Sequence, residues 1–268
     1  MSTLSIEESK RIQLDILTYV DNFCRKNNIS YSLFYGTLLG AVRHKGYIPW
    51  DDDIDICMLR EDFDRFVRLF SQAETDNYVI GDISLSSEWI TPFAKVYDSR
   101  TTLIHKNVST PYMGVFIDIF PIDGASKDDV IFQKDKMERR HYNRIVNGKI
   151  GKLSIKQGLK NNLILICLKS LYCFVSFKKV KYEWNKSSQK RNDEGGKFVS
   201  DAVCGLMKKP LPRDLFENVI DYKFEDRSFL CVSDADTVLK VIYGDYMKLP
   251  PESERVPSHD YIAFWNNK

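Results

Sequence analysis

One short segment, DDDIDICM at residues 51–58, constrains the fold more than any other part of this 268-residue chain. Ile54 and Ile56 alternate with Asp53 and Asp55, which is the period-two pattern of a β-strand with an apolar face and an acidic face. We therefore predict that the two aspartates project side by side while the isoleucines enter a core. Neighbouring carboxylates repel each other unless a cation lies between them, and hard divalent ions prefer carboxylate oxygens. The segment predicts a Mg²⁺ or Mn²⁺ site.

Other interpretations of the acidic run were compared with this one. An EF-hand loop would use Asp51, Asp53 and Asp55 as ligands, but it needs glycine and glutamate where this chain has Ile56 and Asp62, so it is excluded. A glycosyltransferase D-x-D motif normally follows a nucleotide-binding α/β half, whereas only about fifty residues precede this run. A plain solvated strand start stays open at this point.

The residues around the acidic run alternate between helical and strand patterns. A capping box of Ser5 and Glu8 precedes apolar residues at helical spacing, which predicts an opening helix that ends near Asn28. The further predicted elements are a strand at 31–35, a turn at Gly36 and Thr37, a short helix from 38–43, a helix around 63–70, and strands at 78–83, 93–97 and 115–120.

The second half of the chain has a different character. Residues 128–191 are basic and helix-like, and the tail returns to short strands and turns in which Pro250 and Pro251 forbid a continuing helix. We predict a soft boundary that separates a catalytic core at 1–124 from a region at 125–268. The expected fold class is α/β (α+β), with a mixed sheet flanked by helices and a mostly helical C-terminal part.

Composition excludes several classes of protein. Lys plus Arg against Asp plus Glu is 39 − 37 = +2, so the chain has no global charge that would attract nucleic acid. Glu7 and Glu8 stand where an export signal would be cationic, which predicts a cytoplasmic protein. The cysteines form no C-x-x-C pair and are expected to be reduced, buried thiols: Cys24, Cys57, Cys167, Cys173, Cys204 and Cys231.

An apolar stretch, LILICLKSLYCFVSF at residues 163–177, has two interpretations. It is interrupted by Lys169 and is shorter than the roughly 20 residues of a membrane-spanning helix. With Lys178, Lys179 and Lys181 behind it, it has the composition of an interfacial helix that makes a peripheral membrane contact. The alternative is a helix buried against the core whose lysines merely solvate its end.

The residues that flank the acidic run suit phosphate chemistry. Backbone amides at the Gly36-Thr37 turn and the N-terminus of the following helix can hold phosphate oxygens, while the strand places metal ions on the other side of the same phosphates. Phosphoryl transfer depends on positioning and on neutralising charge. The candidate cationic partners are Arg43, His44, Lys95 and Arg100.

Asp118 lies in the otherwise apolar strand VFIDIF. An ionised acid there is unfavourable without a partner. It is therefore either a third metal ligand or the general base, or else a capped or protonated carboxyl near a strand end.

These motifs resemble the LicD family of phosphotransferases, whose relatives include fukutin-related protein and which is similar to the polymerase-β-type nucleotidyltransferases. The likeness is dense through FYGTLLGAVRHKGYIPWDDDIDI, KVYDSRTTLI and VFIDIFPIDG, and it returns at YGDYMKLPPESER. The middle of the chain, roughly residues 128–229, carries little of it.

The resemblance implies transfer of phosphocholine or a polyol phosphate from a CDP-linked donor to a cell-surface glycan, such as lipopolysaccharide, teichoic acid or capsular polysaccharide, or to its lipid-linked precursor. The acceptor hydroxyl would attack the β-phosphorus of the donor; attack at the α-phosphorus would instead make the protein a nucleotidyltransferase. A catalytically silent membrane-associated scaffold is the rival from another class, although a silent enzyme should have lost one acid of the D-h-D pair.

The resemblance also assigns individual residues. Asp53 and Asp55 match the family's metal ligands, Asp51 matches the acid that often precedes them, and Asp118 would join them. Three residues match its C-terminal motif at the rim of the site: Lys248, Arg255 and His259. Four aromatic residues could form a cation–π box for a choline head group, or simply belong to the core: Tyr35, Tyr47, Trp50 and Trp89.

Overall fold

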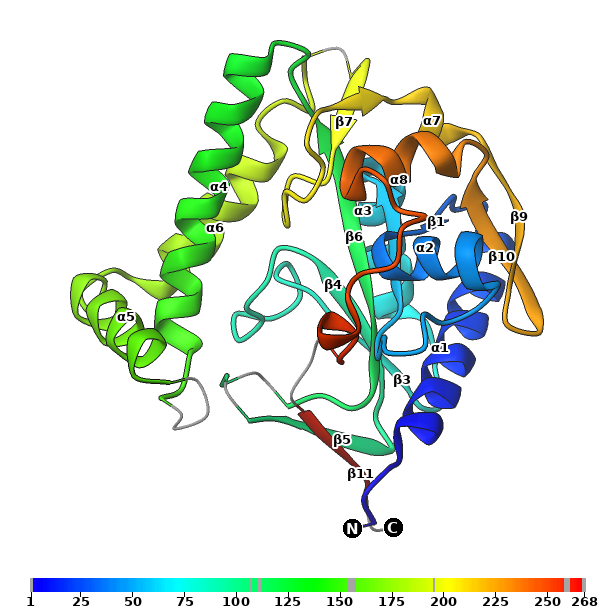
Figure 1. Cartoon of the computed structure of the whole chain (residues 1–268), viewed down its shortest axis with the longest axis horizontal. Helices are drawn as coiled ribbons and strands as arrows, with labels where there is room; N and C mark the ends of the chain where they lie inside the picture. The colour runs from blue at the N-terminus through cyan, green and yellow to red at the C-terminus, as the bar shows by residue number, and fades with distance from the viewer. Residues whose placement is uncertain are drawn as a thin grey trace.

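A curled mixed sheet lies at the centre of the computed structural model (Figure 1), which describes residues 2–106, 108–109, 112–153, 158–194, 196–257 and 261–266. Its strands lie in the order β1 (Ser32–Leu33), β2 (Asp55–Leu59), β6 (Phe116–Gly124), β4 (Ala94–Asp98) and β3 (Tyr78–Gly81). The far end of β6 also pairs with β7 (Phe198–Ser200), which pairs with β8 (Leu211–Pro212). Strands β2 and β6 run parallel, and the other pairs are antiparallel. The mixed α/β class is confirmed.

Helices cover the sheet. Helices α1 (Ile6–Lys26) and α3 (Arg60–Gln72) pack on its strands, and each directs an apolar stripe inward. Helix α2 (Tyr35–His44) packs against β2 and against α8 (Ala235–Tyr243). The capping box that begins α1 is present, because the Ser5 hydroxyl accepts from the Glu8 N–H and the Glu8 carboxylate accepts from the Ser5 N–H.

The hydrophobic core draws on both halves of the chain. Ile16 and Ile54 from the first half share one cluster with Val238 and Leu239 from the last forty residues. The late elements that return to this core are α7 (Asp214–Glu217), the antiparallel ribbon of β9 (Val219–Phe224) and β10 (Arg227–Val232), and β11 (Tyr261–Trp265), which pairs with β5 (Thr101–His105). Helix therefore dominates the C-terminal part only as far as Gln189. The division at residue 124 stays a prediction.

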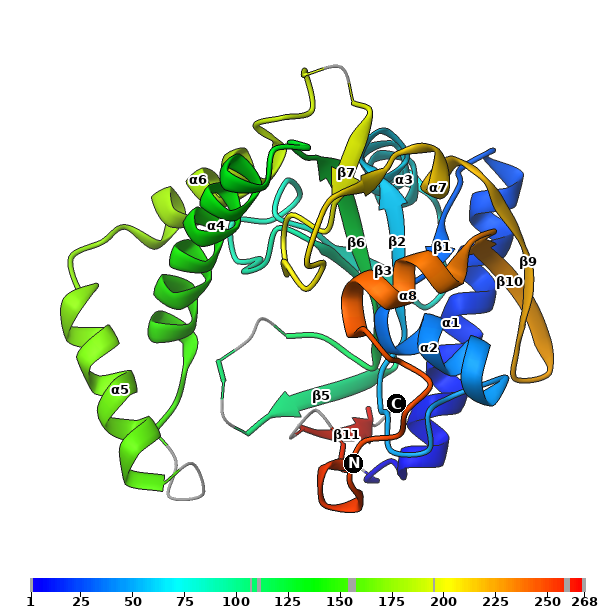
Figure 2. The ribbon, with the colours of Figure 1, turned by 45° about the horizontal axis from the view of Figure 1, so that its top comes forward.

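Residues 129–189 form a helical arm beside this core (Figures 1 and 2). It consists of α4 (Asp129–Ile150), α5 (Gly158–Leu171) and α6 (Phe177–Gln189), and α4 packs against both of the others. A separate apolar cluster that includes Val146, Val180 and Trp184 holds α4 and α6 together. Among the described residues, no helix combines the length and the apolarity needed to cross a bilayer.

The expected burial of the apolar stretch is wrong. Within α5, where every residue is described, Leu165 is the one buried side chain, and Phe174 in the following turn is 99% exposed. Conversely, Lys181 is buried, and its ammonium group donates to the carbonyls of Ser87 and Trp89. Helices α4 and α6 join the arm to the core, and among the described elements α5 packs mainly against α4, which leaves its outer face exposed.

Two local predictions near the acidic run also need correction. Gly36 and Thr37 lie in the first turn of α2, because the chain turns one residue earlier at Tyr35, whose φ is +41°. The strand predicted over 51–58 begins only at Asp55. At Asp52 the backbone carbonyl bonds to side chains instead of a neighbouring strand, because it accepts from the Gln13 amide and the Tyr261 hydroxyl.

The cysteine prediction is half right. All six cysteines are described and unpaired, but Cys167 and Cys173 are exposed on the arm. Cys24, Cys57 and Cys231 are buried in the main core as expected.

Candidate active site

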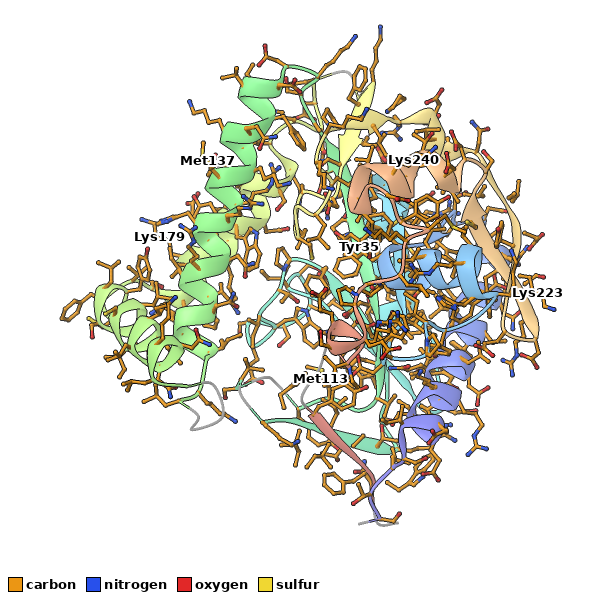
Figure 3. All side chains as sticks on the ribbon, viewed as in Figure 1. Tyr35, Met113, Met137, Lys179, Lys223 and Lys240 are labelled. Carbon is orange, nitrogen blue, oxygen red and sulfur yellow. The ribbon has the colours of Figure 1, made fainter. Side chains whose placement is uncertain are left out.

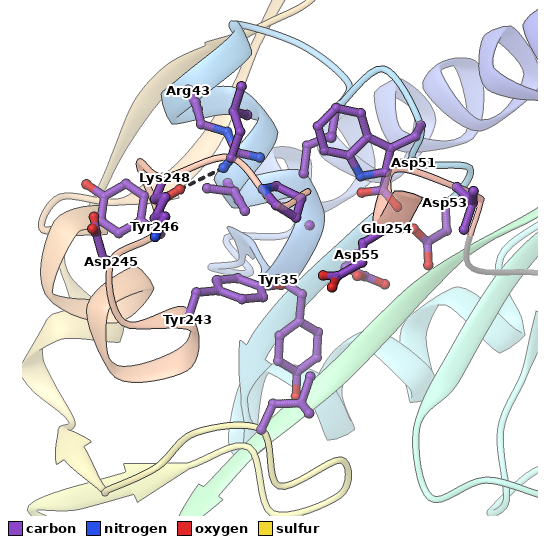
Figure 4. Close-up of a pocket in the computed structure, with 18 of the residues that line it drawn as sticks. Tyr35, Arg43, Asp51, Asp53, Asp55, Tyr243, Asp245, Tyr246, Lys248 and Glu254 are labelled. Carbon is purple, nitrogen blue, oxygen red and sulfur yellow. Dashed lines mark hydrogen bonds between the residues drawn. The ribbon is translucent and has the colours of Figure 1, made fainter. Parts of the chain in front are cut away.

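A pocket of about 600 Å³ lies where α2, the loop before β2 and the segment after α8 meet (Figure 4). Asp51, Asp53 and Asp55 lie on one side of the close-up, and Tyr243, Asp245, Tyr246 and Lys248 lie on the other. Its polar and aromatic lining residues are Tyr35, Arg43, Trp50, Asp51, Asp53, Asp55, Tyr243, Asp245, Tyr246, Lys248 and Glu254. The pocket thus joins segments about 200 residues apart in the chain.

Carboxylates gather at this pocket from three consecutive positions and from two strands. Oxygens of Asp51, Asp52 and Asp53 all lie within 4.8 Å of one another. Asp55 begins β2 and pairs in register with Asp118 on the parallel strand β6. Residues paired in this way project from the same face of a sheet. Asp51, Asp53 and Asp55 therefore line the pocket, Asp118 lies beside Asp55 on the next strand without lining it, and Asp52 adds a carboxylate close to Asp51 and Asp53.

A lysine from the next strand extends this row. Lys95 on β4 is opposite Asp118 in the antiparallel register, and its ammonium group forms an ion pair with the Asp118 carboxylate. Asp55, Asp118 and Lys95 thus follow one another across three adjacent strands. The partner that a buried Asp118 requires is Lys95, and its presence favours an ionised Asp118.

Burial and neighbouring acids raise the pKa values of Asp51 and Asp55. Burial, and after it the neighbouring Asp53 carboxylate, raises the pKa of Asp51 to about 7. Burial also raises the pKa of Asp55 well above its ordinary value, with Asp53, Asp118 and Asp51 adding to the effect and Lys95 opposing it. A cation between the carboxylates would relieve this repulsion. Oxygen donors in this number and spacing fit a Mg²⁺ or Mn²⁺ ion.

The first turn of α2 is shaped around the acids. A Cβ atom at Gly36 would lie 2.4 Å from Oδ2 of Asp51, so only glycine fits beside that carboxylate. The Thr37 hydroxyl accepts from the Asp55 N–H at 2.8 Å and thereby holds the start of β2. Thr37 is buried beneath the pocket and acts on Asp55 rather than lining the cavity.

Tyr35 helps to hold the first turn of α2 in place. Its hydroxyl donates to the carboxylate of Asp201 at 2.5 Å, and that carboxylate also accepts from the backbone N–H groups of Leu206 and Met207. A tyrosine with positive φ is unfavourable and persists only where the surroundings hold it. The Asp201 bond and the aromatic contact with Phe120, 5.1 Å between ring centroids, supply that hold.

Arg43 and Lys248 are the predicted cations that line the pocket. The Arg43 guanidinium donates to the Tyr246 carbonyl at 2.7 Å and to Nε2 of His44 at 3.0 Å. Burial and the nearby Arg43 lower the pKa of His44, which favours the neutral ring that accepts this bond. His44 therefore contacts Arg43 and does not itself line the pocket.

Other predicted residues lie elsewhere. Arg100 forms an ion pair with the buried Asp98 at 2.5 Å and does not line the pocket. Arg255 lies at the rim, with its guanidinium 5.6 Å from the ring of Trp50. His259 falls outside the described residues.

The predicted aromatic box does not form. Tyr35 and Trp50 line the pocket, but the Tyr47 hydroxyl donates to the Lys10 carbonyl. Trp89 is buried in a separate cluster, where its indole N–H donates to the Phe93 carbonyl.

The C-terminal wall supplies residues that sequence reasoning missed. Tyr243, Asp245, Tyr246 and Glu254 all line the pocket. Each belongs to the motif YGDYMKLPPESER, so the motif itself was the available signal. Nothing in the sequence indicated Asp201, because its role depends on Tyr35, which lies 166 positions away.

The fold and site together define a mixed α/β protein whose pocket sets clustered carboxylates opposite cationic and aromatic side chains. Residues 28–150 match the family model described as LicD/FKTN/FKRP, nucleotidyltransferase domain. The chain is 35% identical over 268 residues to the lipopolysaccharide cholinephosphotransferase LicD of Haemophilus influenzae, with 98% of this chain and 99% of that protein covered. This chain belongs to the LicD family.

Shorter likenesses reach uncharacterized proteins of two other bacteria. A protein of Rickettsia typhi is 42% identical over 76 residues, which are 28% of this chain and 25% of that protein. A protein of Rickettsia prowazekii is 37% identical over 87 residues, or 29% of this chain and 33% of that protein.

Proposed function

We propose that this protein transfers phosphocholine from a CDP-linked donor to a glycan in a reaction that depends on a divalent metal ion. The observation that carries the proposal is the carboxylate cluster of the pocket, with oxygens of Asp51, Asp52 and Asp53 within 4.8 Å and Asp55 in the same cavity. The name of the Haemophilus influenzae relative, lipopolysaccharide cholinephosphotransferase, supports the group transferred and the kind of acceptor.

In this proposal Asp51, Asp53 and Asp55 hold one or two Mg²⁺ or Mn²⁺ ions, and Asp118 completes the set from the adjacent strand. Such an ion, when bound, neutralises phosphate charge and stabilises the departing nucleotide. Lys95 forms an ion pair with the Asp118 carboxylate. The Thr37 hydroxyl keeps the start of strand β2 in place by accepting a hydrogen bond from the Asp55 N–H.

The acceptor hydroxyl oxygen attacks the β-phosphorus of the donor. The bond from that phosphorus to the bridging oxygen breaks, CMP leaves with the electron pair, and the hydroxyl proton passes to a carboxylate of the cluster. Arg43 and Lys248 lie across the pocket from the acids and bind phosphate oxygens of the donor. His44 keeps the Arg43 guanidinium in position.

The acceptor in this proposal is a cell-surface glycan, of the lipopolysaccharide, teichoic acid or capsular type, or its lipid-linked precursor. The protein would then work in the cytoplasm, at the inner face of the membrane where such precursors are built. Glycerol phosphate or ribitol phosphate could replace phosphocholine, because the acid cluster recognises the diphosphate that all these donors share.

The test is a donor panel. Purified protein is incubated with CDP-choline, CDP-glycerol or CDP-ribitol and a glycan acceptor, with Mg²⁺, with Mn²⁺ or with EDTA, and CMP is quantified. We expect CMP release with CDP-choline that requires metal. The exposed Asp226, at the turn between β9 and β10 and not among the residues that line the pocket, provides a matched control as Asp226→Asn.

Each alternative has its own outcome in this assay. Release of phosphocholine, with CMP retained on the acceptor, means attack at the α-phosphorus and overturns the phosphotransferase assignment. Turnover that persists in EDTA overturns the metal dependence. No reaction with any donor, from folded protein, favours the silent scaffold.

A further inference from the structure

The outer face of helix α5 is exposed and apolar. Leu159 is 77% exposed, Leu163 is 52% exposed and Leu171 is 68% exposed, and Phe174 just beyond the helix is 99% exposed. A helix on the surface of a globular protein normally turns its apolar stripe inward and its polar residues outward. Contiguous exposed apolar side chains of this kind mark a surface that meets an apolar partner.

The packing of α5 explains why this face is left outside. The helix meets α4 through a narrow strip that contains Leu165 and Leu168. A Cβ atom at Gly148 would lie 3.0 Å from Cβ of Leu168, and one at Gly151 would lie 2.9 Å from Cδ1 of Leu165. The two glycines let the helices approach closely along that strip. The broader apolar face, with Leu159, Leu163 and Ile166 in successive turns, points away.

The arm also carries a concentrated positive charge. Residues 139–182 contain no Asp or Glu, although the whole chain has a net charge of only +2. The basic residues in this segment are Arg139, Arg140, Arg144, Lys149, Lys152, Lys156, Lys160, Lys169, Lys178, Lys179 and Lys181. Three of these lysines are exposed: Lys160 in the first turn of α5, and Lys178 and Lys179 in the first turn of α6. A partner for this surface must therefore be negatively charged as well as apolar.

The surface lies apart from the pocket. Helix α5 is at the outer edge of the molecule in both ribbon views, and Lys179 lies on the same arm (Figures 1, 2 and 3). No residue of the arm lines the pocket described above. Lys181 is turned inward and fixes α6 to the carbonyls of Ser87 and Trp89, so it steadies the arm without facing outward.

We propose that residues 158–179 dock on the surface of a bilayer that contains anionic lipid. The apolar face of α5 and Phe174 enter the boundary between head groups and acyl chains, while Lys160, Lys178 and Lys179 contact anionic head groups. Helix α5 has 14 residues, about 21 Å of helix, which is too short to span a hydrocarbon core of about 30 Å. The attachment is therefore peripheral.

Vesicle flotation tests the docking without any catalytic assay, so its failure is distinct from failure of the proposed function. Full-length protein is mixed with phosphatidylglycerol-containing vesicles or with pure phosphatidylcholine vesicles at low salt. We expect wild-type protein to float with the anionic vesicles and to remain behind with the neutral ones. Raising the salt to 0.5 M, where the screening length falls to about 4 Å, should weaken recovery.

Pairs of variants distinguish binding through this surface from an effect of the protein's overall net charge. Lys178→Gln with Lys179→Gln should lower vesicle partitioning about tenfold to thirtyfold, at about 1 kcal/mol for each lysine. The control pair is Lys26→Gln with Lys223→Gln, which changes net charge equally from exposed positions outside the arm and should leave partitioning unchanged.

An apolar pair completes the design. Leu159→Gln with Leu163→Gln should lower partitioning at least about tenfold, and Ile6→Gln with Ile220→Gln, also exposed, should not. Failure of wild-type protein to float with anionic vesicles overturns the proposal, as does equal flotation with neutral ones. Arm variants that float like wild type also overturn it. Concentration-dependent self-association that Leu159→Gln and Leu163→Gln abolish, without flotation, would assign the surface to a second copy of the chain.

Discussion

The pocket and the helical arm place side chains in opposite kinds of unfavourable environment. The pocket buries acids: Asp55 and Asp118 are both less than 10% exposed. The arm exposes apolar groups, of which Phe174 at 99% is the extreme. Each arrangement is unfavourable without a partner, and we propose a cation for the first and an apolar anionic surface for the second. Violations of ordinary packing thus indicate what each region binds.

The two regions also differ in how firmly they are held. The pocket rests on the main core, to which both halves of the chain contribute, and each acid has neighbours on a second element. The arm is joined to that core through α6 and a smaller cluster. Changes in the pocket should therefore reach catalysis directly, whereas changes in the arm should act on docking and on local stability.

The largest effect should come from Asp53→Asn or Asp55→Asn. Each removes a negative charge from the cluster without changing side-chain volume, so CMP release should fall more than tenfold while circular dichroism stays unchanged. Asp226→Asn, in the exposed ribbon, is the control. Retention of more than about a tenth of the wild-type rate at saturating Mg²⁺, a change of ~1.4 kcal/mol in barrier, would refute the metal assignment.

Gly36→Ala should be nearly as damaging. The new methyl group would lie 2.4 Å from Oδ2 of Asp51, so that carboxylate must move or α2 must shift. We expect CMP release to drop about tenfold, with a fall of a few degrees in Tm, which corresponds to about 1 kcal/mol. Normal activity in this variant would show that the position of Asp51 is unimportant.

The pH dependence of stability tests the electrostatics of the pocket. The pKa of Asp51 is raised to about 7, so the folded protein without metal binds this proton more tightly than the unfolded chain does. Its stability should therefore fall as pH rises from about 4 to about 7, as the carboxylate is forced to ionise. In EDTA at pH 7.5, Asp51→Asn should be more stable than wild type by about 1 to 2 kcal/mol.

That comparison is made by thermal unfolding at several pH values. The advantage of Asp51→Asn should shrink toward pH 4 and vanish below the ordinary aspartate pKa of 3.8, where the carboxyl is protonated in both states. Mg²⁺ should stabilise wild type at pH 7.5 more than it stabilises the variant. A wild-type protein that gains stability between pH 4 and 7 relative to Asp51→Asn would contradict the assigned direction.

The smallest effect is expected at Lys181, which anchors the arm. Lys181→Met keeps most of the apolar stem but loses the bonds to two carbonyls, one of them at 2.7 Å, and should cost about 1 to 2 kcal/mol. Hydrogen exchange should quicken in α6, while CMP release with a soluble acceptor stays near the wild-type rate. Loss of that activity would show that the arm and the pocket are coupled more closely than their separate clusters suggest.

Several features followed from short stretches of sequence because they depend on neighbours in the chain. The capping box that begins α1 involves Ser5 and Glu8, three residues apart, so local hydrogen bonding determines it. The grouping of Asp51, Asp53 and Asp55 likewise follows from their spacing, whether the backbone is a strand or the loop before one. Ile54 and Ile56, which alternate with Asp53 and Asp55, lie in the hydrophobic core, as the alternation predicted.

Other features depend on which segment, distant in the sequence, packs against a given residue in the folded protein. The strand at the acidic run begins only at Asp55, because that is where β6 becomes available for pairing and where Asp118 takes its place beside it. Arg100 was predicted as a phosphate ligand, but in the turn after β4 its guanidinium forms an ion pair with Asp98.

The sequence by itself therefore determined the acidic cluster, the helices with strong local signals, and the family to which the chain belongs. Only the tertiary structure decided that Tyr243 and Tyr246 form the wall opposite the acids, that Asp201 supports Tyr35, and that α5 is exposed while Lys181 is buried. The reason is physical. Burial and pairing between remote segments are set by the packing of the whole chain, and no local pattern of charge or hydropathy specifies which partner will be there.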